Sequence, residues 1–516
     1  MTSPSDDPAS LPERLAALHE AVLSKRPILR ELITKHGSKR LIDYASLYTD
    51  VNLNPPIQRR QDELIGTFRD LVTARFGDTV AQEASQQLTE HYFVSTTDHH
   101  GPIVNQSFCN ANLLTTVTYA EHNDPNLKYV IVFPCSNVSL SNITFPRGLI
   151  FNSVVDGKVQ LQRLSFLPSN AHSAIVYNFR AYTEQDLKKL HQVVKDKLKN
   201  KLVTVDVSDK LHHLLDTVYA DPAVLGQANF SEQMIIANDR LWQTFFTSSG
   251  VAPSRLLDIE QETMTTELLL HYHLFEDTII SNMLFSPEYI PLLEQYFTGI
   301  MGAFNTATKT GTYFFWGISA DKHYRVQLWK QGDKLVASDG SMSIDFTPEA
   351  IAAALRDKKI IPSLLLVFST LCFYYGLKCL GGFNQINYLT EMKNAYLKMN
   401  VDRQNYRSIE VCARAQTKEM NDGYLSAFAG APDGTLLPAT GLDLYLYGNT
   451  HTWSTIMDEA KNITIAESLA PSMPEFYRYV YPEAERLPEL AAITAEQVTE
   501  LTGLTSKLKP CITLTA

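Results

Sequence analysis

The chain has 516 residues, of which 45% are hydrophobic and 20% are charged, as expected for a globular protein of roughly two to four domains. Its net charge of −11 argues against a general nucleic-acid or membrane-surface protein, because both partners are anionic and need a positive face. Residues 1–8 lack the basic and then apolar pattern of an export signal, and the six cysteines show no CxxC spacing. We therefore expect a cytoplasmic protein with free, mostly buried thiols.

The first part of the chain changes from a helical to a mixed pattern near residue 90. Apolar residues such as Leu15 and Leu18 recur at helical spacing and predict an N-terminal helical segment over 1–90. Short apolar runs separated by turn residues predict the first part of an α/β core over 91–182. The strands are predicted near 92–96, 129–134, 147–154 and 174–179.

The remainder reads as helical with one β interruption. A helical region is predicted over 183–311, including a long amphipathic stretch at 258–280. Turn residues predict a β-hairpin insertion over 312–346. An α/β and helical C-terminal part is predicted over 347–516. Its predicted elements are helices at 348–356, 362–380 and 385–399 and a strand at 442–446.

The uncharged run 360–377 tests whether the chain crosses a membrane. It meets the minimum length of a span, but it contains proline, serine and threonine, and no second span accompanies it. We interpret it as a helix buried in a large domain. The predicted fold class is therefore α/β, with a Rossmann-like open sheet core, large helical additions and a small β-hairpin insertion.

The most informative stretch is Thr-Thr-Asp-His-His-Gly-Pro at 96–102, directly after the first predicted strand. In open α/β sheets, ligands bind outside the carboxyl ends of the strands, beside helix N-termini that attract anions. Imidazoles at such a turn can bind a metal, move protons or stabilise developing negative charge. We predict His99 and His100 as catalytic residues that Asp98 orients, with Gly101 close to a cofactor. The alternative is that Asp98 caps the helix and the histidines bond to backbone carbonyls.

A second polar cluster follows the second predicted strand, in the loop 134–148. Hydroxyls, amides and one arginine are suited to holding a carboxylate or a phosphate, so Asn137 and Arg147 are predicted to bind substrate. An ordinary turn is the alternative. Cys135 could be a nucleophile, but a buried thiol is the interpretation we favour because the sequence assigns it no base.

A third cluster, Gly381, Gly382, Asn384 and Gln385, follows the long apolar run. The glycines can bring backbone close to a cofactor, with the two amides on a substrate, or they can form a helix C-cap without function. The hairpin ahead of this cluster mixes aromatic and basic side chains. These could cover a nucleotide-like ligand or form a solvated hairpin, and they are Trp316, Lys322, His323, Tyr324 and Arg325.

Acidic and histidine residues near 270 give no metal site. Glu267 and His271 are four residues apart, as are His273 and Asp277, so each pair can share one helix face. The two pairs point about 120° apart, so one ion cannot use both. With no HExxH motif in the chain, we assign no metal ligands here.

The order of these parts resembles that of the cysteine-adding ligases of bacillithiol synthesis and of related class I nucleotidyl-transferase-like proteins. The matching positions are the turn 97–101, the next helix with Asn110 and Asn112, and the Gly381-Gly382 pair. The resemblance implies a Rossmann-like fold, ligase or transferase activity, a nucleotide as cofactor and a substrate-binding role for Asn110. The two histidines are adjacent here instead of spaced as in HxGH, and the GxGxxG and GxxxxGK[ST] fingerprints are absent.

The leading hypothesis is a cytosolic ligase or transferase acting on a small polar metabolite, with no nucleic-acid or membrane partner. His99 and His100 would stabilise charge or shuttle a proton, and Arg147 would anchor an acid group. One alternative is a metal-dependent enzyme with Asp98, His99, His100 and His122 as ligands. A second alternative is a non-enzymatic helical interaction protein. The sequence leaves the substrate, the cofactor and a homo-oligomeric state open.

Overall fold

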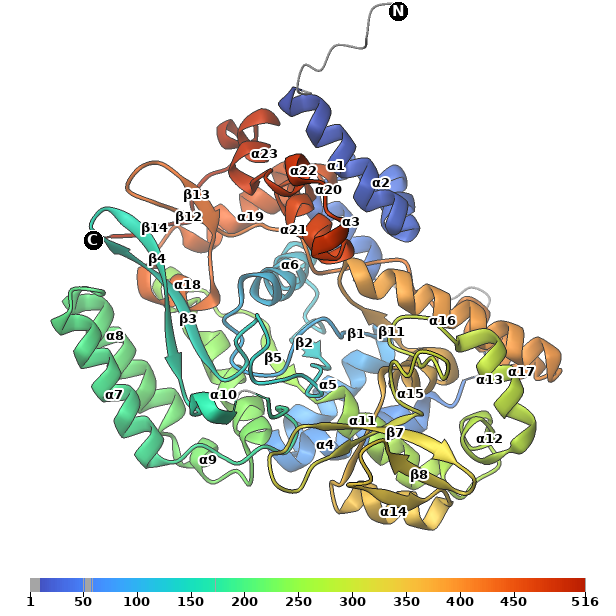
Figure 1. The fold of residues 1–516 in the computed structure, drawn as a ribbon. Helices are drawn as coiled ribbons and strands as arrows, with labels where there is room; N and C mark the ends of the chain where they lie inside the picture. The colour runs from blue at the N-terminus through green and yellow to red at the C-terminus, as the bar shows by residue number, and fades with distance from the viewer. Residues whose placement is uncertain (1–9, 50, 52–56, 58, 172, 516) are drawn as a thin grey trace, which may run out of the picture.

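Four parallel strands form the centre of the fold (Figure 1), in the order β11-β1-β2-β5. The computed structural model describes residues 10–515 except 50, 52–56, 58 and 172, so the predicted signal-free segment 1–8 lies outside the described residues. The strands are β1 (Phe93–Ser95), β2 (Tyr129–Val132), β5 (Arg255–Asp258) and β11 (Lys378–Leu380). With its parallel sheet and many helices, the chain has the α/β class that the sequence predicts.

Helices cover both faces of this sheet, which is why its strands read as continuous apolar runs. Alternate residues of each strand pack into two different cores, as Val130 and Ile131 do in β2. One core includes helices α6 (Gln106–His122) and α10 (Phe230–Thr244), and the other includes α4 (Gln61–Phe76), α5 (Asp78–Glu90) and α11 (Gln261–Leu268).

The helical character predicted for the first ninety residues is confirmed over the described part of that segment. Besides α4 and α5, it contains α1 (Leu11–Lys25), α2 (Pro27–His36) and α3 (Leu41–Thr49). Helix α3 packs against α6, and α1, α2 and α3 each pack against helices of the C-terminal part (Figure 1).

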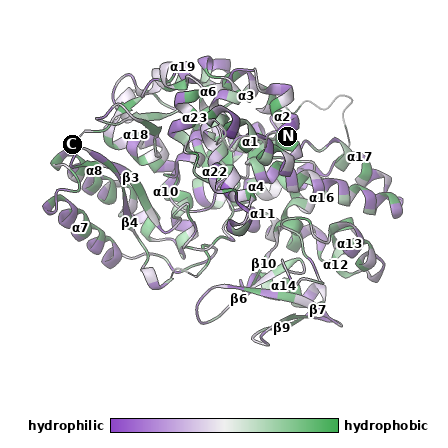
Figure 2. Ribbon diagram, turned by 45° about the horizontal axis from the view of Figure 1, so that its top comes forward, coloured by the Kyte–Doolittle hydropathy of each residue, from purple (hydrophilic) through white to green (hydrophobic). Residues whose placement is uncertain are grey.

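Two antiparallel sheets accompany the parallel one. The strands β3 (Gly148–Val155) and β4 (Lys158–Ser165) pair as a long hairpin, whereas the strand predicted at 174–179 is wrong. That segment forms only an isolated bridge between Ile175 and Ser139. The predicted β insertion is confirmed as part of a sheet that lies with α14 (Pro348–Arg356) at one end of the molecule (Figure 2). Its strands are β6 (Phe315–Ile318), β7 (Arg325–Gln331), β8 (Lys334–Ala337), β9 (Ser343–Asp345) and β10 (Ile360–Pro362).

The two longest helices that the sequence predicts, at 258–280 and at 362–380, are not continuous helices in the structure. The stretch 258–280 begins at the end of β5 and then contains α11 and a π-helical turn, Leu269–His273. The second, predicted over 362–380, divides into the end of β10, α15 (Leu364–Phe368), a π-helical segment (Ser369–Tyr374) and β11. Within the described chain, no helix has the length and apolar character needed to cross a bilayer.

The remaining helices surround these sheets. The predicted helices near 348–356 and 385–399 are confirmed as α14 and α16 (Phe383–Asp402), but the strand predicted at 442–446 is helix α18 (Gly441–Tyr447). The middle of the chain contributes α7 (Glu184–Lys199), α8 (Val205–Leu214), α9 (Pro222–Leu225), α12 (Ile279–Phe285) and α13 (Ile290–Phe297). The C-terminal part contributes the helices α16 (Phe383–Asp402), α17 (Tyr406–Arg414), α18 (Gly441–Tyr447), α19 (Thr452–Asn462), α20 (Ile465–Leu469), α21 (Met473–Val480), α22 (Pro488–Ala491) and α23 (Ala495–Leu501). Its last strands form another small sheet, and they are β12 (Phe428–Gly430), β13 (Leu436–Pro438) and β14 (Ile512–Thr513). All six cysteines are free, and five of them are buried.

Candidate functional site

Four connecting segments meet at the carboxyl edge of the parallel sheet, because all four strands run in the same direction. The predicted turn follows β1, and the loop with Cys135 and Asn137 follows β2. The acidic segment 260–262 follows β5, and the Gly381-Gly382 pair follows β11. This edge is where open α/β sheets bind their ligands.

The three catalytic candidates of the turn have three different sets of partners. The Asp98 carboxylate accepts a hydrogen bond from Asn112 Nδ2 at 3.0 Å. His100 Nε2 lies 2.8 Å from the carbonyl oxygen of Ser231, so this nitrogen carries a proton and donates. His99 Nδ1 lies 3.2 Å from Asn142 Oδ1 in the loop after β2. The three side chains therefore do not point at one common position.

Burial sets the protonation of this turn. Asp98 and His100 are buried, and His99 is half-buried. Burial, followed by the nearby charge of Asp258, raises the pKa of Asp98 well above its ordinary value. Burial also lowers the pKa of His99, which is only partly opposed by its hydrogen bond to Asn142. His99 is therefore a neutral imidazole at neutral pH.

Gly101 allows the turn to pack against the loop after β2. Its φ angle is +154°, and a Cβ atom there would lie 2.6 Å from the carbonyl oxygen of Pro146. Glycine is therefore needed here because the backbone of the turn packs against the backbone of the loop after β2. The role predicted for Gly101 from the sequence was instead a contact with a cofactor.

A buried amide ties the turn to β5. Asn238 Nδ2 donates to the Gly101 carbonyl oxygen at 2.9 Å and to Asp258 Oδ2 at 2.7 Å. Its Oδ1 accepts from the backbone N–H of Ile103 at 3.1 Å. Burial raises the pKa of Asp258 from 3.8 to about 6, although His100 and Asn238 lower it. The edge of the sheet thus contains two carboxyl groups whose pKa is raised, that of Asp98 well above its ordinary value and that of Asp258 to about 6.

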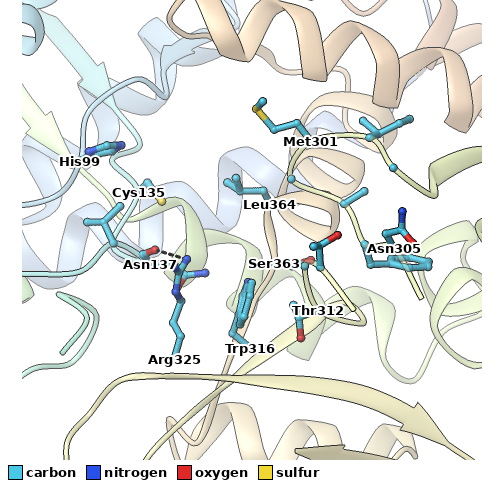
Figure 3. A pocket seen from close by; sticks show the side chains of 18 residues that line it. His99, Cys135, Asn137, Met301, Asn305, Thr312, Trp316, Arg325, Ser363 and Leu364 are labelled. Atoms are coloured by element: carbon cyan, nitrogen blue, oxygen red, sulfur yellow. Dashed lines mark hydrogen bonds between the residues drawn. The ribbon is translucent and has the colours of Figure 1, made fainter. Parts of the chain in front are cut away.

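A cavity of about 450 Å³ opens beside this edge (Figure 3). His99, Cys135 and Asn137 line one side, Trp316 and Arg325 from β6 and β7 line another, and the loop 299–305 lines a third. Its size falls within the range of about 300–1,000 Å³ that is typical of small-molecule sites.

Arg325 connects the two sheets across this cavity. Its Nη1 donates to the backbone carbonyl of Asn137 at 3.4 Å, and its guanidinium carbon lies 4.9 Å from the centre of the Trp316 ring. Figure 3 shows Arg325 and Trp316 side by side below Asn137. Asn137 Oδ1 is buried and has no hydrogen-bond partner within the described part of the chain. The cavity lining thus includes the Arg325 cation, the Trp316 ring, the Asn137 amide and the His99 imidazole.

Cys135 lines the cavity as a thiol. Its Sγ lies 3.2 Å from Glu262 Oε1, and burial together with the Glu262 charge raises its pKa well above the ordinary value, although Arg325 opposes this. A nucleophilic cysteine needs its thiolate form. Cys135 is half-buried instead of buried as we expected, but its raised pKa disfavours the thiolate that a nucleophile needs.

Three of the predicted substrate-binding residues lie away from this cavity. Asn110 Oδ1 accepts from the backbone N–H groups of Ser426 and Ala427, at 2.8 and 2.9 Å. Asn384 Oδ1 accepts from Arg26 Nε at 2.8 Å. Arg147 is half-buried, with its guanidinium carbon 5.2 Å from the centre of the Phe145 ring. Of the residues predicted as catalytic, substrate-binding or cofactor-binding, His99 and Asn137 line the cavity, together with Trp316 and Arg325 of the hairpin that could cover a ligand.

The remaining predicted residues lie directly after β11, where the chain enters α16. Gln385 Nε2 donates to Thr96 Oγ1 at 2.6 Å. A Cβ atom at Gly381 would lie 2.1 Å from Gln385 Cδ, and one at Gly382 would lie 2.9 Å from Asp422 Oδ2. The helix C-cap predicted at this pair is wrong, because the glycines join β11 to α16. They make room for two neighbouring polar side chains.

The predicted metal ligands are also separated. His122 lies at the last turn of α6 with Nε2 3.0 Å from Ser46 Oγ, whereas the predicted turn precedes the first turn of that helix. Among residues that the structure describes, no group of three or more histidine, cysteine or acidic side chains is arranged to hold a metal ion.

Several residues at this edge carried no usable sequence signal. The loop 299–305, Asn238 and Glu262 stand in segments that read as ordinary helix or connection. Trp316 and Arg325 stood out only as part of a mixed aromatic and basic hairpin. No known family model matches the chain, and no curated protein is significantly similar to it.

Proposed function

We propose that the protein is an enzyme, a ligase or transferase, that binds a small anionic metabolite with a planar group in the cavity at the sheet edge. The observation that carries this proposal is the position of Arg325, which lines the cavity, bonds to the backbone carbonyl of Asn137 and lies against Trp316. A guanidinium is the preferred partner of carboxylates and phosphates, and an indole face stacks on planar groups. A nucleotide or an aromatic acid has both features.

His99 supplies the acid–base group in this proposal. Its Nδ1 donates to Asn142 Oδ1, which leaves Nε2 as the proton acceptor of a neutral ring. A general base of this kind contributes a factor of about 10²–10⁴ to a reaction rate. His100 and Asp98 hold the turn in place through Ser231 and Asn112 and do not line the cavity.

The metal-dependent alternative requires Asp98, His99 and His100 to converge on one position. Because each has a different partner, we do not propose it. A purely helical interaction protein would not need a polar cavity at the carboxyl edge of a parallel sheet.

Ligand binding can be tested by thermal unfolding of the full chain with nucleotides and with aromatic and aliphatic acids. We expect at least one anionic planar compound to raise the midpoint for the wild type and not for Arg325→Ala. Lys330→Ala is the matched control, because this cation is on the same strand and bonds to Gly332 instead of lining the cavity. The proposal fails if no compound raises the midpoint or if Arg325→Ala responds like the wild type.

Catalysis needs a separate test. If the bound compound is a nucleoside triphosphate, release of phosphate or pyrophosphate that depends on an added amino acid, with the nucleotidyl or phosphoryl group recovered on that acceptor, would show transfer, and His99→Gln should reduce the rate by about 10² or more. Binding without turnover would contradict the enzymatic part of the proposal and leave a binding protein.

A further inference from the structure

A second cavity, of about 340 Å³, lies at the end of β5 and shares no lining residue with the first. Its walls come from α4, α10, α11 and the end of α14. Two acidic residues after β5 divide between the two regions. Glu262 bonds to the loop behind the first cavity, whereas Glu260 lines the second.

The charges that line this second cavity are balanced. Three are cationic and three are acidic, and they are Arg75, Arg356, Lys358, Glu232, Glu260 and Glu267. Only part of this charge is paired inside the cavity. Arg75 Nη2 lies 3.7 Å from Glu232 Oε1, and Lys358 Nζ donates to Asn178 Oδ1 at 3.2 Å. The cavity therefore presents both signs of charge to a ligand.

Glu260 gives the clearest sign that the cavity has an occupant. The residue is only 3% exposed, and within the described chain its Oε1 has no hydrogen-bond partner. Its Oε2 accepts from Thr263 Oγ1 at 2.7 Å, and His100 Nε2 is 3.9 Å from Oε1, beyond hydrogen-bond distance. A buried carboxylate oxygen without a donor is costly, so a ligand that donates to it is strongly favoured.

A second buried group in the same wall also lacks a partner. Thr266 is 6% exposed, and its Oγ1 has no hydrogen-bond partner among the described residues. Thr266 and Glu260 belong to the first turns of α11 and its N-cap, so they present a hydroxyl and a carboxylate from one rigid segment.

We propose that this second cavity binds a free α-amino acid, with its ammonium on Glu260 and its carboxylate on Arg75 and Lys358. A simple anion would leave the Glu260 oxygen without a donor, and a simple amine would leave the cations without an acceptor. An amino acid carries one group of each sign and keeps the lining neutral. The volume suits a ligand of that size, at the lower end of small-molecule sites. This proposal stands independently of the function proposed for the first cavity.

The test is binding of each of the twenty standard amino acids to the full chain, by thermal shift and then by calorimetry. At least one should raise the unfolding midpoint, and its N-acetyl and methyl-ester derivatives should not. Glu260→Gln and Lys358→Gly should each weaken its binding by tenfold or more. We expect Lys358→Gly to fold like the wild type, because φ is +54° at this position and glycine adopts this left-handed backbone without strain. A loss of binding in this variant is therefore not explained by misfolding.

Two controls separate this site from the first cavity. Glu349→Gln, on the exposed first turn of α14, should bind the amino acid like the wild type. Arg325→Ala should also retain amino-acid binding even if it abolishes binding in the first cavity. The proposal is overturned if none of the twenty amino acids binds, if the N-acetyl derivative binds equally well, or if both cavity variants bind like the wild type.

Discussion

The carboxylate of Glu262 holds Ser136 by two hydrogen bonds, from its backbone N–H at 3.0 Å and from its hydroxyl at 2.9 Å. The other carboxylate oxygen accepts from the backbone N–H of Asn137 at 3.2 Å. These contacts fasten the loop after β2 to the first turn of α11. The position of Asn137 in the first cavity therefore depends on a side chain 125 residues away in the sequence.

Replacing Glu262 should destabilise the protein strongly. Glu262→Ala leaves buried N–H and hydroxyl donors without acceptors, and each such loss costs about 1–3 kcal/mol. We expect the free energy of unfolding to fall by about 3 kcal/mol in urea denaturation, whereas the exposed control Glu349→Ala should change it by less than about 0.5 kcal/mol. Ser136→Ala removes only the hydroxyl and should cost about 1–2 kcal/mol. Equal stability of the Glu262 and Glu349 variants would contradict this assignment.

The part of the sheet that the sequence reveals is the part flanked by polar turns. The strands β1 and β2 are apolar runs that end in Asp98-His99-His100 and in Pro134-Cys135-Ser136, so their ends are visible in the pattern. β5 and β11 are no shorter than β2 and β1, with four and three residues, but they stand beside stretches that read as helix. A short buried strand cannot be distinguished from buried helix by periodicity alone, which explains why both were missed.

The composition of the site depends on contacts over long sequence separations. Arg325 and Asn137 are 188 residues apart, and β1 pairs with β11 across nearly 300 residues. The residue types at the turn predicted an edge rich in polar groups, and the structure places His99 and Asn137 at a cavity there. No local pattern could show that Asn110 and Asn384 bond to other segments, because their partners are Ser426 and Arg26.

Asp258 should make the stability of the protein depend on pH. Its folded pKa of about 6 lies above the ordinary 3.8, so its contribution to stability is complete below about pH 4 and is lost as the pH rises through about 6. Asp258→Asn cannot ionise and still accepts from Asn238. We expect the stability of the variant, relative to the wild type, to increase by up to about 3 kcal/mol between pH 4 and pH 8.

Urea denaturation of both proteins across this pH range measures the difference, and most other titrating groups cancel in the comparison. A difference that stays constant with pH would show that Asp258 titrates normally in the folded state. An opposite slope would show that its charged form is stabilised by His100 and Asn238 more than burial penalises it.

Gly101 should tolerate no side chain. In Gly101→Ala, the new methyl group would lie 2.6 Å from the Pro146 carbonyl oxygen, so the turn and the loop after β2 must separate. We expect a loss of about 2–4 kcal/mol in the free energy of unfolding. Gly157→Ala is the matched control, since its φ is +76° and its Cβ would meet no atom within 4 Å. It should lose only about 1 kcal/mol. Similar losses in both variants would mean that the contact with Pro146 is unimportant.

Lys358 ends helix α14 in a position that normally belongs to glycine. The backbone N–H of Lys358 donates to the carbonyl oxygen of Leu355, and the backbone N–H of Lys359 donates to the carbonyl oxygen of Ala354. This pair of hydrogen bonds is the Schellman motif. The φ of +54° at Lys358 costs a side-chain-bearing residue about 1–2 kcal/mol. Despite this conformational cost, the chain has a lysine here, and Lys358 lines the second cavity.

We therefore expect the free energy of unfolding of Lys358→Gly to be equal to that of the wild type or up to about 1 kcal/mol higher. This holds although the variant loses the hydrogen bond to Asn178. Lys359→Gly is the matched control one residue further on, where φ is not positive, and it should lose about 0.5–1 kcal/mol. Urea denaturation of the two variants gives opposite signs if the left-handed backbone is the cause. If Lys358→Gly is more stable than the wild type but no longer binds the amino acid, Lys358 contributes to ligand binding and lowers the stability of the fold. A loss of stability in both variants would contradict this conclusion.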